Sequence, residues 1–399
     1  MKNTVWAIIV VIVCLLQIPL DDGWSTLATG EPAAIVFADP AFEKAVRSVL
    51  AKRTGDILTS DVAEIKKLNV SGKGITDLQE IAYFTSLEEL YCNRNQLTKL
   101  DLSGNTSLRI LNCSENYSLT ELDISSAAAL EELHCGYNRL TFLDLSNNTA
   151  LRVLACMCND LTELDLSANT KLEILLCKAC SLQRLDISHN PELVMVDCHY
   201  NAITELDITA NKKLQDLVCL GNRINRLIVG DTEVLEHLNC DYNDLTTLDV
   251  QGATALRSLF CSNNQLKELH IEGLSHFESL HCGENQLSEL ELVNVPELNS
   301  LHCGGNKIAF LDLSQYGNLK DLSCYDNTLT VLDVSNNPKL EELGCANNFL
   351  ETLDIRQNEE LKVLYCYNNL FPGPEAILGL ENRTLERFWF EDPEYAGIQ

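Results

Sequence analysis

Residues 87–107 read LEELYCNRNQLTKLDLSGNTS, and close variants of this stretch follow one another along most of the chain. Fourteen cysteines recur in register with it, 21 residues apart except for one step of 22 between Cys113 and Cys135. A fixed period of this length is typical of one structural unit that is repeated and stacked. The ladder cysteines are Cys92, Cys113, Cys135, Cys156, Cys177, Cys198, Cys219, Cys240, Cys261, Cys282, Cys303, Cys324, Cys345 and Cys366.

Each copy of the repeat predicts two short strands. Leu90 and Cys92 alternate with other residues, as do Leu100 and Leu102, and this period of two places the apolar side chains on one face. Neither strand can bury that face alone, but stacking in parallel places each leucine on the leucine of the preceding coil. We therefore expect an α/β-type repeat solenoid of about fifteen coils, with parallel β-sheets and few helices outside an N-terminal cap.

An asparagine stands three residues after 13 of the 14 ladder cysteines, and Cys180 replaces it in the remaining copy. The chain must leave the strand at this point, so backbone N–H and C=O groups lose their strand partners. Because an asparagine amide both donates and accepts hydrogen bonds, we expect these side chains to satisfy the buried turn.

The pattern L-x-x-L-x-C-x-x-N-x-L combined with L-x-x-L-D-L-x-x-N resembles the leucine-rich repeats of the internalins, a family of bacterial surface proteins, and within them the cysteine-ladder type with a 21-residue repeat. The resemblance extends over about residues 39–371. It implies a right-handed leucine-rich-repeat solenoid. It also implies a function in adhesion, in which the concave face engages a host surface protein or glycoprotein.

The segment that precedes the first full copy resembles an internalin N-terminal cap. Asp39 followed by Pro40 is a favourable start for a helix. One face of that helix collects Phe42, Val46, Val49 and Leu50. We therefore assign residues 39–86 to a helical N-terminal cap with a first, irregular repeat, and residues 87–371 to the repeats of 21–22 residues.

The N-terminus has the charge order of a secretory signal: Lys2, an apolar run from Val5 to Leu20, and then two aspartates. We assign residues 1–38 to a signal peptide and linker. This assignment predicts a secreted or extracellular protein. A protein that is associated with the cell surface is a variant of this hypothesis. The apolar run is 16 residues long, close to the roughly 17 that a membrane span needs, so an uncleaved anchor is the alternative.

At the other end of the chain, FPGP at residues 371–374 interrupts the repeat, and we assign residues 372–399 to a C-terminal cap. No sorting motif or hydrophobic tail follows, so anchoring to the cell wall is not expected.

Acidic residues outnumber basic ones by 58 to 29, which gives a formal net charge of −29. This balance argues against nucleic acid, anionic lipid and anionic wall polymers as ligands. We expect a monomer that binds a protein or glycoprotein, with membrane contact only through an uncleaved N-terminal segment.

Seventeen cysteines in an exported chain would ordinarily suggest disulfides. The ladder position, however, faces the core, where cysteine behaves as a small apolar residue. Neighbouring ladder cysteines point the same way, which fits the dihedral of a disulfide poorly. We expect a ladder of buried free thiols that binds no metal, because thiols in a line do not converge. Cys158 and Cys180 lie outside the ladder and are the candidates for accessible thiols.

The sequence contains no motif of a catalytic site. It lacks a phosphate-binding glycine loop, a nucleophile elbow and an HExxH motif, so neither an enzyme nor a cofactor is expected. His281 and His302 occupy the same strand position in consecutive coils, where their rings would lie about 5 Å apart. The pair could share a metal, but no third ligand is evident, so we prefer surface histidines in an aromatic-rich binding face.

A second ladder consists of aspartates in the LDLS part of the repeat: Asp101, Asp123, Asp144, Asp165, Asp186, Asp207, Asp249, Asp312, Asp333 and Asp354. One hypothesis is a stripe that binds cations or a basic partner. The other is a solvated edge in which each carboxylate bonds locally to a hydroxyl or a backbone N–H. We prefer the second, because the aspartate belongs to the repeat itself.

Function is expected where the copies differ, on the exposed residues that flank each ladder cysteine. Around the fourth to seventh coils these are apolar, which is typical of an interaction site: Val153, Ala155, Met157, Ile174, Leu176, Met195, Val218 and Leu220. Beside them run residues with polar or aromatic rings: His199, Tyr200, Tyr242, Phe260, His281, His302, Tyr325, Tyr365 and Tyr367.

Together these residues form the candidate ligand-binding surface of a non-enzymatic scaffold. Packing within the sheet is the alternative explanation for the same residues. Two alternative functions also remain open at this point: a self-associating structural protein of the cell surface, and a binder of bacterial wall or mucin glycans.

Overall fold

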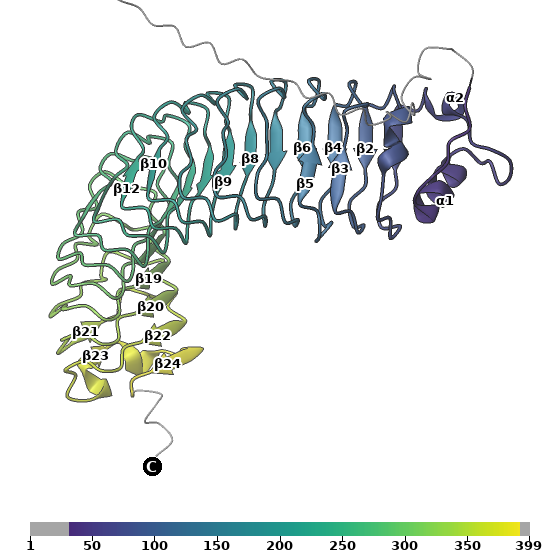
Figure 1. The fold of residues 1–399 in the computed structure, drawn as a ribbon. Coiled ribbons are helices and arrows are strands. Elements are labelled where there is room, and N and C mark those ends of the chain that lie inside the picture. The colour runs from purple at the N-terminus through teal and green to yellow at the C-terminus, as the bar shows by residue number, and fades with distance from the viewer. Residues whose placement is uncertain (1–31, 392–399) are drawn as a thin grey trace, which may run out of the picture.

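The computed structural model describes residues 32–391 and forms a long stack of coils with parallel strands, which confirms the predicted solenoid. Figure 1 shows the stack as an arch: its axis runs nearly straight through the N-terminal coils and turns between β9 and β19. Of residues 1–38, which we assigned to a signal peptide and linker, residues 1–31 lie outside the described part of the chain. Within residues 32–391, no helix has the length and apolar character needed to cross a membrane.

One sheet of 16 parallel strands runs through the whole stack, with one strand from each coil. The strands are β1 (Lys67–Asn69), β2 (Glu89–Tyr91), β4 (Ile110–Asn112), β6 (Glu132–His134), β7 (Val153–Ala155), β8 (Ile174–Leu176), β9 (Met195–Asp197), β11 (Asp216–Val218), β13 (His237–Asn239), β15 (Ser258–Phe260), β17 (Ser279–His281), β18 (Ser300–His302), β19 (Asp321–Ser323), β20 (Glu342–Gly344), β22 (Val363–Tyr365) and β24 (Arg387–Trp389).

Four short strand pairs form where the second half of each repeat passes the other side of the stack. They are β3 (Lys99–Asp101) with β5 (Glu121–Asp123), β10 (Glu205–Asp207) with β12 (Arg226–Ile228), β14 (Thr247–Asp249) with β16 (Glu268–His270), and β21 (Leu353–Asp354) with β23 (Ile377–Leu378). In Figure 1, β19, β20, β22 and β24 lie on the inner side of the arch, and β21 and β23 lie on the outer side. We call the long sheet the inner sheet.

The core lies between the two sets of strands. The central residue of each inner strand, a leucine except for Val196 and Phe388, is aligned with that of the next coil, as in the step from Leu90 to Leu111. Each ladder cysteine is buried. Burial raises the pKa of the Cys92 thiol to about 12, so these thiols stay protonated and inert. The described cysteines are free thiols. Cys158 is half-buried, but the expectation that Cys180 is accessible is wrong, because its thiol lies inside the turn.

The asparagines that follow the ladder cysteines satisfy the buried turn, as predicted. The Asn95 amide donates to the carbonyl oxygens of Cys92 and Val70, each at 2.9 Å, and its own oxygen accepts the N–H of Ile75. One side chain thus joins two consecutive coils.

A second buried asparagine ladder lies toward the outer side of the coils. Asn148 is typical: its amide donates to the carbonyl oxygens of Ile124 and Ala127. Ala127 interrupts this ladder near its N-terminal end, and in the part of the chain that bends its position is taken by Thr232, Ala253, Leu274, Val295 and Tyr316.

Two helices and an irregular coil close the N-terminal end. In α1 (Pro40–Val49), Asp39 caps the helix by accepting the N–H groups of Ala41 and Phe42, as predicted. The predicted apolar face is partly wrong, because Val49 is 47% exposed and Ala45 packs against the core instead. Next come α2 (Thr59–Val62) and a 3-10 helix, η1 (Gln79–Tyr83), beside β1.

At the C-terminal end, the chain adds one more strand to the inner sheet. Two 3-10 helices, η2 (Pro374–Ala376) and η3 (Leu380–Asn382), flank β23, and β24 then pairs with β22. Phe371, Phe388 and Phe390 pack partly buried against the last coil. Residues 392–399 of the predicted cap lie outside the described part of the chain.

Candidate functional site

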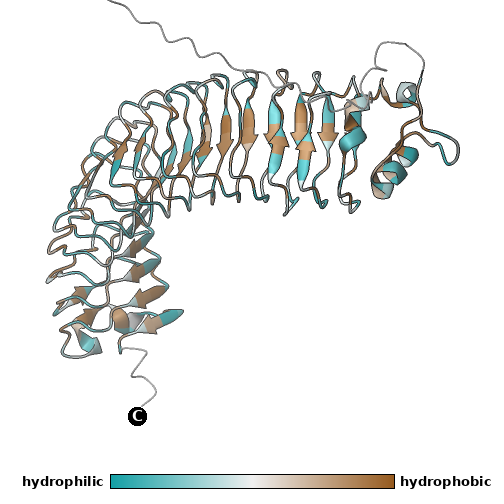
Figure 2. Cartoon of the chain, in the orientation of Figure 1, coloured by the Kyte–Doolittle hydropathy of each residue, from teal (hydrophilic) through white to brown (hydrophobic). Residues whose placement is uncertain are grey.

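The inner sheet turns the first and third residue of each strand outward, because the central residue points into the core. Val153, Ile174 and Met195 are first residues and are aligned in consecutive strands. Val153 and Ile174 are half-buried and Met195 is 36% exposed, so the three side chains form an unbroken apolar strip across β7, β8 and β9. We call these three residues the Val153 row. In Figure 2, β7 and β8 are brown over their length, whereas β6 has hydrophilic ends.

The other predicted apolar residues do not form a continuous patch. Asp197 separates Leu176 from Val218 in the aligned third positions of the strands. Lys178 and His199 separate Met157 from Leu220 at the positions that follow the cysteines. All four apolar side chains are half-buried.

Ala155 is a correction to the candidate surface. It is only 4% exposed, because its methyl group is too short to rise above the longer side chains beside it. The sequence pattern identified the direction in which Ala155 points, but not whether the side chain reaches solvent.

Carboxylates lie at both ends of the Val153 row. Glu132 precedes Val153 in the aligned first positions, and Asp216 follows Met195. A third carboxylate, Asp241, follows Leu220 one coil later and accepts the N–H of Ser262 at 2.6 Å. Burial raises the pKa of Asp241 to about 6, although that hydrogen bond acts in the opposite direction. The apolar surface is therefore bordered by negative charge.

A stack of rings occupies the sheet farther along the arch. The ring centroids of Phe260 and His281 are 4.5 Å apart, and those of His281 and His302 are 4.2 Å apart. The predicted proximity of the two histidines is thus confirmed. Nε2 of His302 lies 2.8 Å from Oδ2 of Asp321. Burial, and then the neighbouring His302, lower the pKa of His281, which favours its neutral form. Because the rings cover one another's faces, the stack presents mainly ring edges to solvent.

Tyr200 and Tyr242 lie beside the sheet, in the turns that follow its strands. Tyr200 and Tyr242 are 62% and 60% exposed, but each stands two residues after its cysteine with φ values of 53° and 52°. The equivalent residue of each coil adopts this left-handed conformation, which ends the strand and turns the chain. A Cβ at Gly221 would lie 2.4 Å from the Tyr200 ring, so glycine makes room for that ring in the next coil.

Tyr325 and Tyr365 are held by specific neighbours. The Tyr325 ring lies over Gly304, where a Cβ would approach it to 2.5 Å, and its hydroxyl donates to Glu284 at 3.3 Å. The Tyr365 ring packs against Trp389 with centroids 4.8 Å apart. Both tyrosines thus have packing partners within the chain. Contacts of this kind do not by themselves indicate a ligand.

The aspartate ladder has the local hydrogen bonds that the preferred hypothesis predicts. Oδ1 of Asp101 accepts the N–H of Ser103 at 2.8 Å, and each of the ten aspartates makes the equivalent bond two residues on. The Ser146 hydroxyl and N–H lower the pKa of Asp144, which remains ionised at neutral pH. These carboxylates cap the turn of the repeat.

A ladder of alternating charge that was not predicted stands one residue before each strand of the inner sheet, which is four residues before each ladder cysteine. Ion pairs join consecutive coils along it, as between Arg109 and Glu131 at 2.9 Å and between Arg152 and Glu173 at 2.8 Å. Neutral residues stand at the phase changes of the ladder, the positions where the order of acidic and basic residues shifts by one coil. The full series is Lys66, Glu88, Arg109, Glu131, Arg152, Glu173, Val194, Gln215, Glu236, Arg257, Glu278, Asn299, Lys320, Glu341, Lys362 and Glu386. Aligning the copies on the cysteine would have revealed it.

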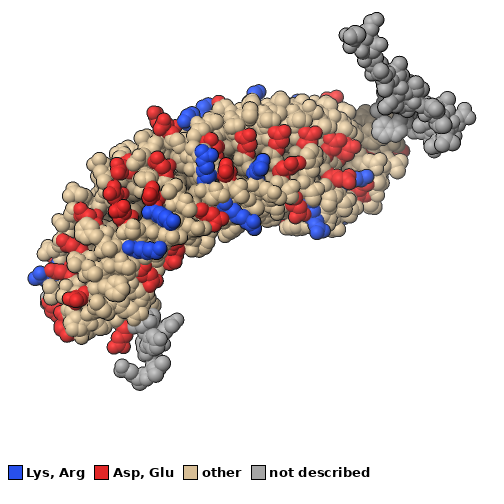
Figure 3. Space-filling view, turned by 60° about the vertical axis from the view of Figure 1, so that its left-hand side comes forward, with Lys and Arg blue, Asp and Glu red and all other residues tan. Residues whose placement is uncertain are grey.

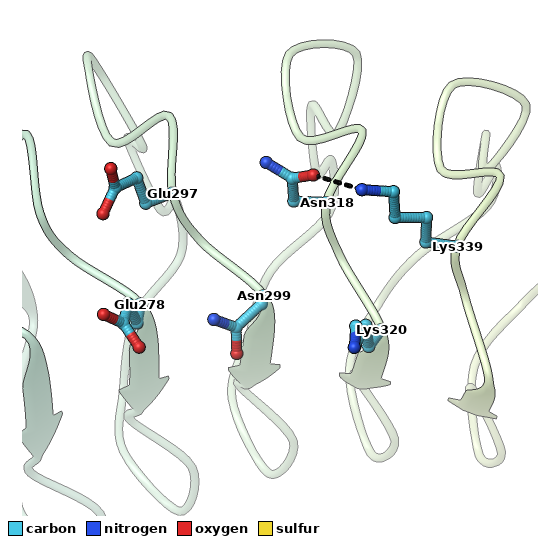
Figure 4. A pocket seen from close by; sticks show the side chains of 6 residues that line it. All are labelled: Glu278, Glu297, Asn299, Asn318, Lys320 and Lys339. Carbon is cyan, nitrogen blue, oxygen red and sulfur yellow. Dashed lines mark hydrogen bonds between the residues drawn. The ribbon is translucent and has the colours of Figure 1, made fainter.

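A hollow of about 460 Å³ opens at one of these phase changes, around Asn299. Figure 4 shows Glu278 and Glu297 on one side of it and Lys320 and Lys339 on the other. Lys339 donates to Asn318 at 2.8 Å. The hollow is open and polar and contains no catalytic arrangement of side chains. In residues 32–391, no three His, Cys, Asp or Glu side chains are placed to hold a metal ion.

The surface charge follows the composition. Figure 3 shows acidic side chains spread in rows over the face that it presents, with fewer lysines and arginines among them. This distribution does not concentrate positive charge on the visible face, as a nucleic-acid interface would require.

Comparisons with known proteins relate the chain to one group of repeat proteins. Comparisons with protein-family models and with curated proteins both found no match. Among solved structures, the functional domain of InlJ from Listeria monocytogenes, which includes a cysteine ladder, is 37% identical, with a TM-score of 0.78 and coverage of 86% of this chain and 77% of that one.

Two further structures share the fold at lower identity. A leucine-rich-repeat protein of Leptospira interrogans is 24% identical, with a TM-score of 0.63 over 80% of this chain and 93% of that one. The internalin InlF of Listeria monocytogenes is 22% identical, with a TM-score of 0.58 over 92% and 100%. On the identity and coverage shared with InlJ, and on its own ladder, the chain belongs to the cysteine-ladder internalins, a family of leucine-rich-repeat proteins.

Proposed function

We propose that this chain is a secreted or surface-associated, non-enzymatic recognition protein that binds a host surface protein or glycoprotein through its inner sheet. The observation that carries the proposal is the Val153 row, in which three apolar side chains are aligned across adjacent strands and remain accessible. Contiguous accessible apolar surface of this kind usually marks an interaction site.

The physical basis of binding would be a preformed surface. The strands of the inner sheet are locked by their neighbours on both sides, so the outward side chains lose little conformational freedom when a ligand binds. Membership in the internalins supports a protein-binding scaffold. Export and the nature of the ligand are parts of this proposal.

A binding screen with the full chain tests the proposal. The chain is immobilised and exposed to host surface proteins and glycoproteins, to the same proteins after enzymatic removal of their glycans, and to bacterial wall fragments. We expect binding to a protein or glycoprotein that weakens at least about tenfold in Ile174→Asp. Val331→Asp is the matched control, because Val331 is 66% exposed in the outer part of its coil and should leave binding unchanged.

Three outcomes would contradict the proposal. If folded Ile174→Asp binds as the wild type does, the inner surface is not the binding site. If binding follows the glycans or the wall fragments, the chain is a glycan binder. The third outcome is measured by light scattering. If the wild type forms a stable dimer and Leu176→Asp plus Leu220→Asp abolishes it, the surface binds a second copy of the chain.

A further inference from the structure

The Val153 row lies in a line that begins and ends with a carboxylate. The aligned residues are Glu132, Val153, Ile174, Met195 and Asp216, each paired in register with the next. Four strand spacings of about 4.8 Å place the two carboxylates about 19 Å apart. The line runs along the axis of the solenoid, across the strands.

These carboxylates have few cations of their own. Within residues 32–391, no lysine or arginine forms an ion pair with Asp216. Glu132 lies 3.7 Å from Nε2 of His134, and Arg152 is close enough to attract it without forming an ion pair with it. The neighbouring Arg152 pairs with Glu173 instead. A ligand that covers the apolar centre therefore meets available negative charge at both ends, and the formal net charge of −29 adds to the attraction for a basic one.

The spacing along the line distinguishes an extended ligand from a helical one. Same-face residues of an extended strand repeat about every 6.6 Å, so five of them span about 26 Å and overshoot the line by about 7 Å. The apolar stripe of an α-helix repeats every 3.5 residues, or about 5.2 Å, and five positions span about 21 Å. The five positions on a helix therefore differ in total length from the line of residues by only about 2 Å. A lysine side chain is long and flexible enough to bridge this difference.

The width of the surface also fits a helix. Leu176 lies beside Ile174 on β8 and Val218 lies beside Asp216 on β11, and Met157 and Leu220 lie just beyond the ends of β7 and β11. From the first to the last of these positions is four residues of extended chain, about 13 Å, against a helix diameter of about 10–12 Å. The half-buried side chains of these four apolar residues would contact the side of the helix.

From this match we infer that the partner segment is a basic amphipathic α-helix that lies along the solenoid axis on the Val153 row. Its apolar stripe contacts Val153, Ile174 and Met195, and a lysine or arginine at each end of the stripe pairs with Glu132 and Asp216. This inference rests on the proposed function and specifies the chemistry of the partner. It predicts a motif of one basic, three apolar and one basic residue, at successive steps of four, three, four and three residues.

Synthetic peptides test the inference directly on the full chain. The basic-helix peptide carries lysine, three leucines and lysine at those steps in a background of alanine and glutamine. An acidic-helix peptide replaces both lysines by glutamate. A strand peptide has the composition of the first with its leucines and lysines at alternate positions. We expect the basic-helix peptide to bind at least about tenfold more tightly than either of the others.

A charge exchange tests the two carboxylates. In the double variant Glu132→Lys plus Asp216→Lys, we expect the preference to reverse, with the acidic-helix peptide binding at least about tenfold more tightly than the basic one. The matched control is Glu205→Lys plus Glu268→Lys, which makes the same charge change at exposed positions of the outer strands β10 and β16 and should leave the preference for the basic peptide unchanged.

The outcomes separate this inference from the proposed function. If Ile174→Asp abolishes binding of the host protein but the wild type binds none of the peptides, or binds the strand peptide best, the inner surface is correct and the helical partner is wrong. If the peptides bind with equal affinity in the wild type and the double variant, the carboxylates play no part and the inference fails. If Ile174→Asp alters neither protein nor peptide binding, both proposals fail.

Discussion

Sγ of Cys180 lies 3.2 Å from the carbonyl oxygen of Cys156, at the position that an asparagine amide occupies in the other coils. An asparagine there donates to two carbonyls and accepts an N–H from the preceding coil, as Asn159 does with Cys135, Cys156 and Leu140. A thiol offers one weak donor and no amide oxygen. The coil at Cys180 is therefore held less firmly than its neighbours.

Cys180→Asn should stabilise the protein. The new amide can donate to the carbonyls of Cys156 and Cys177 and can accept the N–H of Leu161, which faces it. Net hydrogen-bond contributions of about 1 kcal/mol each suggest a gain of about 1–2 kcal/mol in the free energy of unfolding, measured by denaturant titration. The reverse change one coil later, Asn201→Cys, should cost a similar amount. Equal stability of both variants and the wild type would show that the amide network contributes little.

Asp241→Asn should stabilise the protein at neutral pH. The pKa of Asp241 is raised from 3.8 to about 6, so the folded state binds this proton more tightly than the unfolded state. The associated stability is present below about pH 3.8 and is lost as the pH rises through about 6. A shift of this size corresponds to about 3 kcal/mol, and solvent screening of the half-buried carboxylate reduces the expected gain to about 1–2 kcal/mol at pH 7.5.

Thermal melts between pH 4 and pH 7.5 check this prediction. The wild type should lose stability relative to Asp241→Asn as the pH rises through about 6, whereas the variant of the exposed Asp231, Asp231→Asn, should follow the wild type. Parallel pH profiles for Asp241→Asn and the wild type would mean that Asp241 titrates alike in both states.

Asp39→Ala should loosen the N-terminal cap. One oxygen of Asp39 accepts two N–H groups at the start of α1, and the other accepts the N–H and hydroxyl of Thr76 in the first coil. Burial alone would raise the pKa of Asp39, but these hydrogen bonds outweigh it and lower the pKa to about 2. The loss of a helix cap and of a buried tertiary contact should cost about 2–3 kcal/mol.

The pH dependence of Asp39 has the opposite sign to that of Asp241. Because its pKa is depressed, its contribution is present above about pH 3.8 and is lost as the pH falls through about 2. Denaturant titration at pH 7 should show the full cost of Asp39→Ala, and the exposed Asp56 provides the control Asp56→Ala. A cost no larger than that of the control would exclude Asp39 as the link between α1 and the first coil.

Arg109→Glu should destabilise the stack in a salt-dependent way. The change places three glutamates in a row in the charge ladder, at residues 88, 109 and 131, where ion pairs now join the coils. We expect a lower Tm at low ionic strength and recovery of most of the loss in about 1 M salt, since exposed charges are screened there. Arg223→Glu, an exposed arginine outside the ladder, should change the Tm less at low salt. A salt-independent loss would point to packing by the arginine side chain.

The sequence was sufficient for the architecture because the same constraint recurs in each coil. A leucine or cysteine that recurs every 21 residues can be buried only by a neighbouring copy, so periodicity alone implies the stack, the parallel sheet and the direction of each side chain. The asparagine turn and the aspartate cap followed from the same reasoning, since each residue acts within its own coil or the next one.

The candidate surface could be predicted only in part from the sequence. Periodicity identified the direction of Ala155 but not its burial, and the repeat pattern did not show that Tyr200 stands in a left-handed turn beside the sheet. Both properties depend on how far neighbouring side chains extend and on the backbone conformation after the strand. The reach of the side chains differs from coil to coil, and the left-handed conformation recurs in each coil at a position that no single residue type marks in the sequence.

The sequence by itself determined that this chain is a cysteine-ladder solenoid with its thiols in the core, because a repeated apolar face is buried when the copies stack against one another. Only the tertiary structure decided which outward residues become neighbours across coils. It placed Glu132, Val153, Ile174, Met195 and Asp216 in one line although they lie about 21 residues apart along the chain. A binding surface is defined by distances between coils, and these exist only once the coils are stacked.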